Sequence, residues 1–257
     1  MSGLIYSKAQ SDVPYYIKEI GKNIYSIEEL SFYLYNYLYL VDEDFFDEKL
    51  IDYIENQLDN TKVASGLRQA IEHDATLSEM VSVVIKNSGY HNANEIHDFQ
   101  KQLDLLRASS MTERQKAKAD ILMNNRKFSM ALDIYNKIAQ NREPDISGEF
   151  YGNVYNNIGV VYANVFDFEQ AKLYFSRAYS TNHDLLSLKH LIYAAIMLNE
   201  DLDKTLERYS ISSDMVEKCK SDIEGIMKDE NHLFSMDEDL EKYVENIKQE
   251  YENEFLI

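Results

Sequence analysis

One pattern of apolar residues recurs along the chain and constrains its fold more than any other feature. In the clearest copy the separations are 3, 1, 3, 6, 3, 4 and 3, at Tyr155, Ile158, Gly159, Tyr162, Phe168, Ala171, Phe175 and Ala178. The same frame moved back by 40 residues gives Ala119, Leu122, Phe128, Ala131, Tyr135 and Ile138. Moved forward by 34 residues, it gives Ile192, Ile196, Leu202, Thr205 and Tyr209. Such self-similarity predicts helical units that stack on one another.

This spacing resembles the tetratricopeptide repeat (TPR), a helix–turn–helix unit of about 34 residues. The resemblance implies that large residues fill the gap between two antiparallel helices, with Gly159 and Ala171 at their closest approach. The first copy has Gln115 where a large aromatic residue is usual, and the third has Tyr193 and Thr205 where small residues are usual. We therefore expect an all-α fold, an α-solenoid of TPR-like helical hairpins with a helical N-terminal region.

Sequence patterns that predict helices also occur before and after the repeat copies. Capping boxes start at Ser26, Thr76 and Asn92, each with Glu three residues later. We expect helices at about 27–40, at 46–58, after residues 76 and 92, and over 213–228 and 237–251. The expected regions are a helical N-terminal region (1–110, possibly a diverged solenoid), the TPR-like repeats (111–219) and C-terminal capping helices (220–257). Two questions stay open: whether 1–110 is a separate domain, and whether 4–25 is a helix or a hairpin turning at Gly21.

Charge excludes some classes of partner. The chain has 26 basic and 45 acidic residues, a net charge of −19, so nucleic acid and anionic membrane surfaces would repel it. The excess lies at the two ends: 1–110 holds 18 acidic and 9 basic residues, 111–200 holds 10 of each, and 201–257 holds 17 and 7. The most apolar run, 32–41, is interrupted by Asn36 and is about half of what spans a bilayer. The chain also has a single cysteine and so forms no internal disulfide, which fits a reducing compartment. Together these features predict a cytoplasmic protein.

The sequence offers little for catalysis. The six histidines lack zincin spacing, and His91, Glu95 and His97 would not share one helical face, so we expect no metal site. Cys219 lies between Lys218 and Lys220, whose charges would lower the pKa of its thiol, but a partly buried structural thiol is the favoured interpretation. No glycine-rich phosphate loop occurs. We therefore expect neither enzymatic activity nor a cofactor.

Binding is the function that the repeat pattern favours. The resemblance implies that the first helix of each pair lines a concave surface, here with Lys116, Met123, Asn153, Asn156, Asn157, Val160, Asn164, His190 and Met197. Asn side chains can bond an extended peptide backbone in both directions, and Met adapts to varied side chains. This composition suits a peptide or a partner helix, although the asparagines could equally be ordinary solvated residues.

These features predict a non-enzymatic adaptor or scaffold that holds a partner protein in its groove. One alternative is an acidic chaperone-like protein for a basic client, and a second is an enzyme with a dispersed site. Tyrosine adds a further expectation, because Tyr33, Tyr35, Tyr37 and Tyr39 cannot all point inwards on one helix. A tyrosine-rich surface could then serve a partner or a homo-oligomer.

Overall fold

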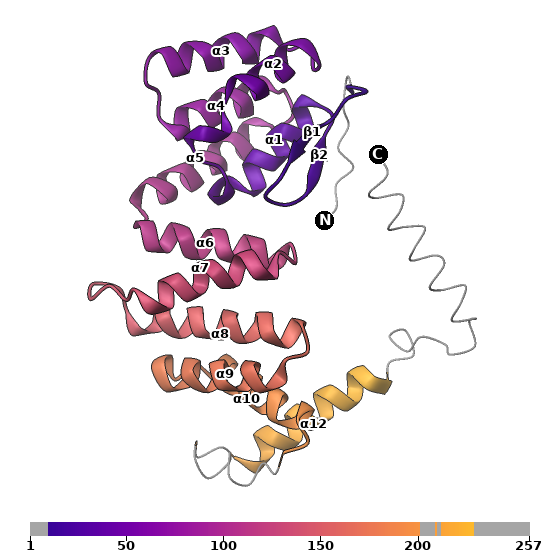
Figure 1. The fold of residues 1–257 in the computed structure, drawn as a ribbon, viewed down its shortest axis with the longest axis vertical. Helices are drawn as coiled ribbons and strands as arrows, with labels where there is room; N and C mark the ends of the chain where they lie inside the picture. The colour runs from indigo at the N-terminus through magenta and orange to yellow at the C-terminus, as the bar shows by residue number, and fades with distance from the viewer. Residues whose placement is uncertain (1–9, 201–208, 210–211, 229–257) are drawn as a thin grey trace, which may run out of the picture.

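The structure is mainly helical, as expected. It is a computed structural model that describes residues 10–200, 209 and 212–228. Within them lie eleven α-helices, two short 3₁₀ helices and one two-stranded sheet. Figure 1 shows the helices stacked along the long axis of the molecule, with the sheet beside the N-terminal helices. In the described residues, no helix is long and apolar enough to cross a membrane.

The N-terminal segment forms a hairpin, one of the two alternatives left open. Strands β1 (Tyr15–Ile17) and β2 (Lys22–Ile24) pair antiparallel. Gly21 turns the chain with φ +66°, a conformation that glycine adopts without steric cost. The Tyr53 hydroxyl donates to the carbonyls of Val13 (3.0 Å) and Ile24 (2.7 Å), which fastens the hairpin to the helix that carries Tyr53.

Five helices follow the hairpin. They are α1 (Ile27–Asn36), α2 (Glu48–Asn56), α3 (Thr61–Glu72), α4 (Leu77–Asn87) and α5 (Ala93–Ala108), with 3₁₀ turns at Leu38–Leu40 and Glu43–Phe45. The capping boxes at Thr76 and Asn92 form as expected. The first helix ends at Asn36, short of the expected residue 40, because Tyr37 leaves helical geometry and a tighter turn then brings Leu38 and Leu40 into the core.

Helix α3 was missing from the sequence expectations. Asn60 caps it by accepting from the Val63 amide (3.1 Å), and Val63 and Leu67 are buried one turn apart. This cap and four-residue spacing were the signals that could have found it. Arg68 on α3 bonds Asp52 and Glu55 on α2, both at 2.7 Å.

Six further helices make up the rest of the described chain. They are α6 (Met111–Asn124), α7 (Phe128–Gln140), α8 (Gly148–Asn164), α9 (Phe168–Asn182), α10 (Leu185–Met197) and α12 (Ser213–Lys228). From α6 to α10 each helix packs on the next, and α12 packs on α10. The bounds of α12 match the expectation, whereas the helix expected at 237–251, together with Leu202 and Thr205, lies outside the described residues.

The turns that follow α3, α6, α8 and α10 share one geometry. Each has a hydrogen bond from an amide to the carbonyl five residues earlier: Ala75 to Ala70 (2.9 Å), Lys127 to Leu122 (2.9 Å), Asp167 to Tyr162 (2.9 Å) and Glu200 to Ala195 (3.1 Å). The last three turns are 40 and then 33 residues apart, so the expected step of 34 is one residue too long here. The corrected frame makes Ile192, rather than Tyr193, the counterpart of Gly159.

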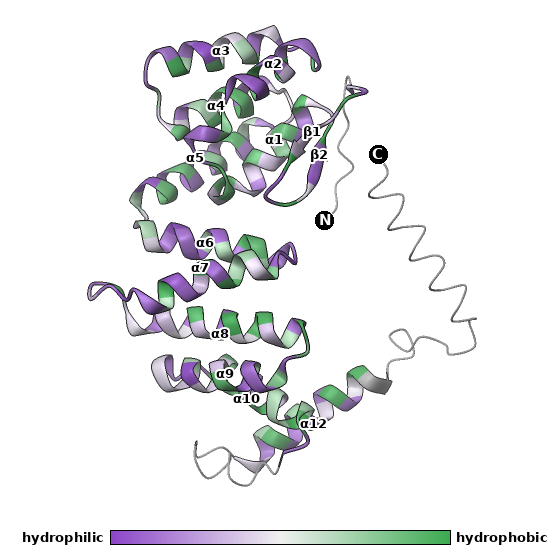
Figure 2. Ribbon diagram, in the orientation of Figure 1, coloured by the Kyte–Doolittle hydropathy of each residue, from purple (hydrophilic) through white to green (hydrophobic). Residues whose placement is uncertain are grey.

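Buried apolar residues form two clusters. The larger runs without a break from Ile17 to Val161, so the core continues across residue 110 from the N-terminal helices into α6, α7 and α8. The smaller joins α9, α10 and α12, from Ala171 to Cys219. Figure 2 shows hydrophobic residues along α8 and α10, the helices on either side of α9 in the chain.

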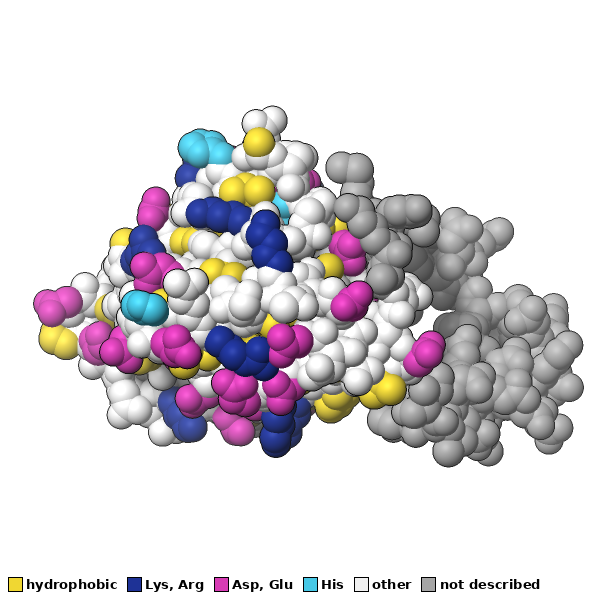
Figure 3. All heavy atoms as spheres, turned by 90° about the horizontal axis from the view of Figure 1, so that it is seen from above, with side chains coloured by type: hydrophobic (Ala, Val, Ile, Leu, Met, Phe, Trp, Pro, Cys, Tyr) yellow, Lys and Arg dark blue, Asp and Glu magenta, His cyan; other side chains and the backbone are white. Residues whose placement is uncertain are grey.

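The four tyrosines expected to supply a surface patch pack against the core to different extents. Tyr33 is buried, and Tyr35, Tyr37 and Tyr39 are half-buried against the larger cluster, because the turn after Asn36 redirects the last two. Among the described tyrosines Tyr16 is the most exposed, at 60%. At the end of the molecule that α2 and α3 form, Figure 3 shows basic side chains interspersed among acidic ones.

Candidate functional site

A polar network joins α6, α7 and α8. Asp120 accepts from the Tyr135 hydroxyl (2.5 Å) and from Nδ2 of Asn157 (2.8 Å), and it pairs with Nζ of Lys116 (2.7 Å). Tyr135 is fully buried, and its burial, with the Asp120 charge next, raises its pKa. The Met123 sulfur lies 3.9 Å from the same hydroxyl. Met123 and Asn157 therefore take part in contacts between helices, whereas Lys116 pairs with Asp120 within α6.

Two more asparagines of α8 also bond neighbouring helices. Asn156 is buried, and its Oδ1 lies 2.9 Å from Nδ1 of His190 on α10. Oδ1 of Asn153 accepts from Nδ2 of Asn182 on α9 (3.3 Å). The side-chain oxygens of Asn153 and Asn156 therefore bond α9 and α10, so these atoms are already engaged within the chain.

The other four expected groove residues meet at one hollow between α8 and α10. It is a cavity of about 410 Å³ lined by Val160, Ala163, Asn164, Phe166, Phe168, Phe175, His190, Tyr193, Ala194 and Met197. Small side chains on the two facing helices leave the space open, and Phe168 and Phe175 belong to α9, which packs on both. A mainly apolar hollow of this size falls within the range of binding pockets, about 300–1,000 Å³.

Phe166 is the most unusual residue of this groove cavity. Its side chain is 80% exposed, and its backbone has φ +61°. Bulky residues adopt this left-handed conformation at a cost of about 1–2 kcal/mol, which the fold must offset. The matching positions in the turns after α3, α6 and α10 hold Asp74 (φ 51°), Arg126 (φ 58°) and Asn199 (φ 52°), none of which is a large apolar residue. The chain thus places an exposed aromatic ring beside an apolar hollow at an energetic cost.

Polar groups occur at the α10 side of the groove cavity. His190 is half-buried with its ring 5.0 Å from the Phe175 ring, and burial lowers its pKa, opposed by the charge of Asp184. The Tyr193 hydroxyl donates to Asp222 on α12 (2.8 Å). Burial, assisted by this hydrogen bond, raises the pKa of Tyr193. At neutral pH the cavity therefore presents a neutral imidazole and a neutral phenol.

Comparisons with known proteins give no match for this chain among protein-family models, curated proteins or solved structures. In the part of the chain that the structure describes, no three His, Cys, Asp or Glu side chains converge to hold a metal ion.

Sequence reasoning missed several residues of the groove cavity. The repeat pattern places Phe168 and Phe175 in the repeat core and makes Tyr193 a departure from it, and it gives Phe166 no role. One signal was available for Phe166: it stands in the helix–turn position where Asn or Gly is usual. The openness of the hollow itself depends on side-chain volumes across three helices, which no local pattern reports.

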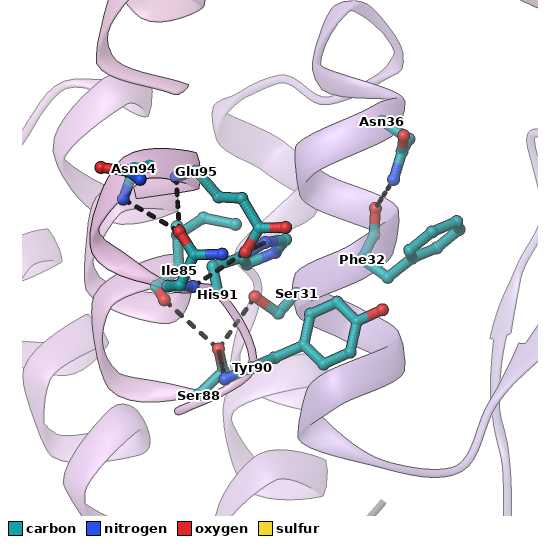
Figure 4. A network of polar contacts seen from close by, with 10 residues as sticks. Ser31, Phe32, Asn36, Ile85, Ser88, Tyr90, His91, Asn94 and Glu95 are labelled. Atoms are coloured by element: carbon teal, nitrogen blue, oxygen red, sulfur yellow. Dashed lines mark hydrogen bonds and ion pairs between the residues drawn. The ribbon is translucent and has the colours of Figure 1, made fainter. Parts of the chain in front are cut away.

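His91 lies in a second polar cluster, between α1 and α5 (Figure 4). Its Nδ1 is 3.8 Å from Glu95, its ring stacks 4.5 Å from that of Tyr35, and burial lowers its pKa. The Glu95 carboxylate accepts from the Asn92 amide (2.8 Å) as a helix cap, and Ser88 donates to Ser31 (2.9 Å). This arrangement joins helix ends in the N-terminal region.

Cys219 is fully buried in the smaller cluster. Burial raises the pKa of its thiol and outweighs the opposing charges of Lys189 and Lys218. A thiol held in its neutral form is a poor nucleophile, so the surroundings of Cys219 suit a packing role.

Proposed function

We propose that this chain is a TPR-like α-solenoid protein that binds a partner protein through the groove cavity between α8 and α10. The bound element is a short segment that inserts a bulky apolar side chain beside Phe166. The observation that carries this proposal is Phe166 itself, an exposed aromatic ring in a costly backbone conformation next to an apolar hollow. Strained residues of this kind concentrate at binding sites.

The repeated turns and the consecutive packing of α6 to α10 support the repeat architecture. Hydrogen bonds within the chain remove three asparagines from the set of proposed binding residues. Asn153, Asn156 and Asn157 fix the helices, whereas Val160, Asn164, His190 and Met197 border the hollow. Affinity would come mainly from the burial of apolar surface, with Asn164 as the exposed polar group of α8 nearest the partner.

Capture of binding proteins with matched turn variants tests this function. Phe166→Gly removes the ring, and Arg126→Gly makes the same backbone change in the turn after α6, away from the hollow. We expect Arg126→Gly to retain the partner and Phe166→Gly to lose about tenfold or more in affinity, since one buried apolar side chain contributes about 1.5–3 kcal/mol. Equal capture by both variants would contradict the proposed site.

The salt dependence of binding distinguishes this proposal from the acidic chaperone alternative. Apolar burial at the groove persists at high ionic strength, whereas attraction between an acidic chain and a basic client is screened. We expect the partner that depends on Phe166 to remain bound at about 0.5 M salt, where the Debye length is well under 10 Å. Loss of all bound proteins at this salt concentration, from wild type and variant alike, would favour the chaperone.

A further inference from the structure

A second cavity lies where the N-terminal region meets α6 and α7. Its volume is about 410 Å³, and it shares no residue with the groove cavity. Six of its lining residues are apolar or aromatic: Tyr39, Val41, Leu77, Leu106, Met111 and Ile134. They come from the segment after α1, from α4 and α5, and from α6 and α7, so the cavity exists only in the folded chain.

Three cations, Arg114, Lys118 and Lys137, converge on this junction cavity. Nε of Arg114 donates to the Ser109 carbonyl (3.1 Å), and Nη2 donates to the Arg107 carbonyl (3.4 Å). Both acceptors are neutral carbonyl oxygens, so they orient the guanidinium without neutralising its charge. Nη1 takes part in neither bond. Nη1 can therefore donate to a carboxylate or phosphate oxygen while the other two nitrogens hold the guanidinium in place.

None of these three cations forms a salt bridge with any residue that the structure describes. Arg114 and Lys118 are half-buried, so their charges are less well solvated than those of exposed lysines. The cavity also has two carboxylates, Asp42 and Glu43, and both are exposed. The half-buried wall is therefore cationic, and the acidic groups lie toward solvent.

We propose that the junction cavity binds a small amphiphilic anion, with its acidic head group against Arg114 and Lys118 and its apolar body against Leu106 and Ile134. The size of the cavity falls in the range of small-molecule sites, and an apolar lining with a few convergent polar groups is their usual composition. This site is independent of the groove proposed for a partner protein.

Calorimetric titration with sodium decanoate, below its micellar concentration, tests the proposal on the full chain. Lys118→Gln with Lys137→Gln removes two cavity cations. The control, Lys62→Gln with Lys86→Gln, removes two exposed lysines on α3 and α4 that do not line the cavity. We expect the cavity pair to weaken decanoate binding about tenfold or more, because it removes charge-assisted hydrogen bonds to the head group, and the control pair to leave it nearly unchanged.

Further ligands and one further variant test the head group and the position of the site. Decanol has the same apolar body without charge, and we expect it to bind more weakly and to be unaffected by the cavity pair. Decyl phosphate, titrated in parallel, distinguishes a phosphate head group from a carboxylate as the better fit. Met111→Glu adds a carboxylate at a 69% exposed lining position and should abolish decanoate binding without disturbing the core.

The reverse change should strengthen binding. Asp42→Asn with Glu43→Gln removes the two rim carboxylates, and we expect decanoate affinity to rise, while Phe166→Gly in the groove should leave it unchanged. Equal binding of decanol and decanoate, equal effects of the cavity and control lysine pairs, or unchanged decanoate binding by Met111→Glu would each overturn the proposal. Melting temperatures of every variant distinguish a lost site from a lost fold.

Discussion

A Cβ atom added at Gly159 would lie 2.6 Å from the ring of Phe175, closer than the two groups can approach. Gly159 is on α8 and Phe175 on α9, so the missing side chain lets the two helices pack against each other. This contact is the one that the repeat pattern assigned to these residues, with the glycine at the closest approach and the aromatic ring filling the gap.

Gly159→Leu should therefore destabilise the fold. Overpacking at a contact this tight costs about 1–3 kcal/mol, which denaturant unfolding would detect. Gly225→Ala is the control, because a Cβ there meets nothing within 4 Å. It should be neutral or stabilising by up to about 1 kcal/mol, as expected for glycine in a helix. An unchanged free energy of unfolding in Gly159→Leu would contradict the packing of α8 on α9.

Phe166→Gly should leave the fold as stable as wild type or make it more stable. Replacing Phe166 with glycine removes about 1–2 kcal/mol of backbone strain in the left-handed conformation. Glycine also raises the entropy of the unfolded chain, which lowers stability by about 0.5–1 kcal/mol. Arg126→Gly should behave in the same way, because its φ of 58° is nearly that of Phe166. Thermal unfolding measures both variants. A large stability loss in Phe166→Gly alone would mean that its ring serves packing rather than binding.

Asn157→Ala should lower stability, although the sequence placed Asn157 in a binding groove. The substitution removes a donor to the Asp120 carboxylate and to the Tyr135 hydroxyl (3.3 Å). We expect a loss of about 1–3 kcal/mol in urea unfolding. Asn164→Ala on the same helix is the control: Asn164 is exposed and donates only within α8, so its loss should stay within about 0.5 kcal/mol. Equal effects of the two would contradict a structural role for the network.

Stability should fall as pH is lowered from about 7 to 5. Burial lowers the pKa of both His91 and His190 in the folded chain below the usual value near 6.5. The unfolded chain then binds protons that the folded chain does not, so acidification through this window favours unfolding. His190→Gln should flatten the pH dependence of the melting temperature, because it removes one of the two half-buried imidazoles. Parallel profiles for wild type and His190→Gln would count against this linkage.

Local chemistry was sufficient to predict many elements of the fold. A capping box needs only residues within one turn, so the starts of α4 and α5 were predictable from Thr76 and Asn92. The contact of Gly159 with Phe175 was likewise predictable from residue size and spacing. The end of α1 and the existence of α3 were not, because weak local signals there compete with burial against other helices.

The sequence by itself determined that the chain is mainly helical, where most of its helices begin, and which residues face the neighbouring helix. Only the tertiary structure decided which polar groups remain free. Asn156 and Asn157 have the chemistry to bind a peptide, but their partners His190 and Asp120 lie 34 and 37 residues away, and packing brings them within hydrogen-bond distance. The two cavities also arise at this level, since each is the space left by side chains from several helices. Periodicity reports the face on which a residue lies, whereas the partner it meets there depends on the folded chain.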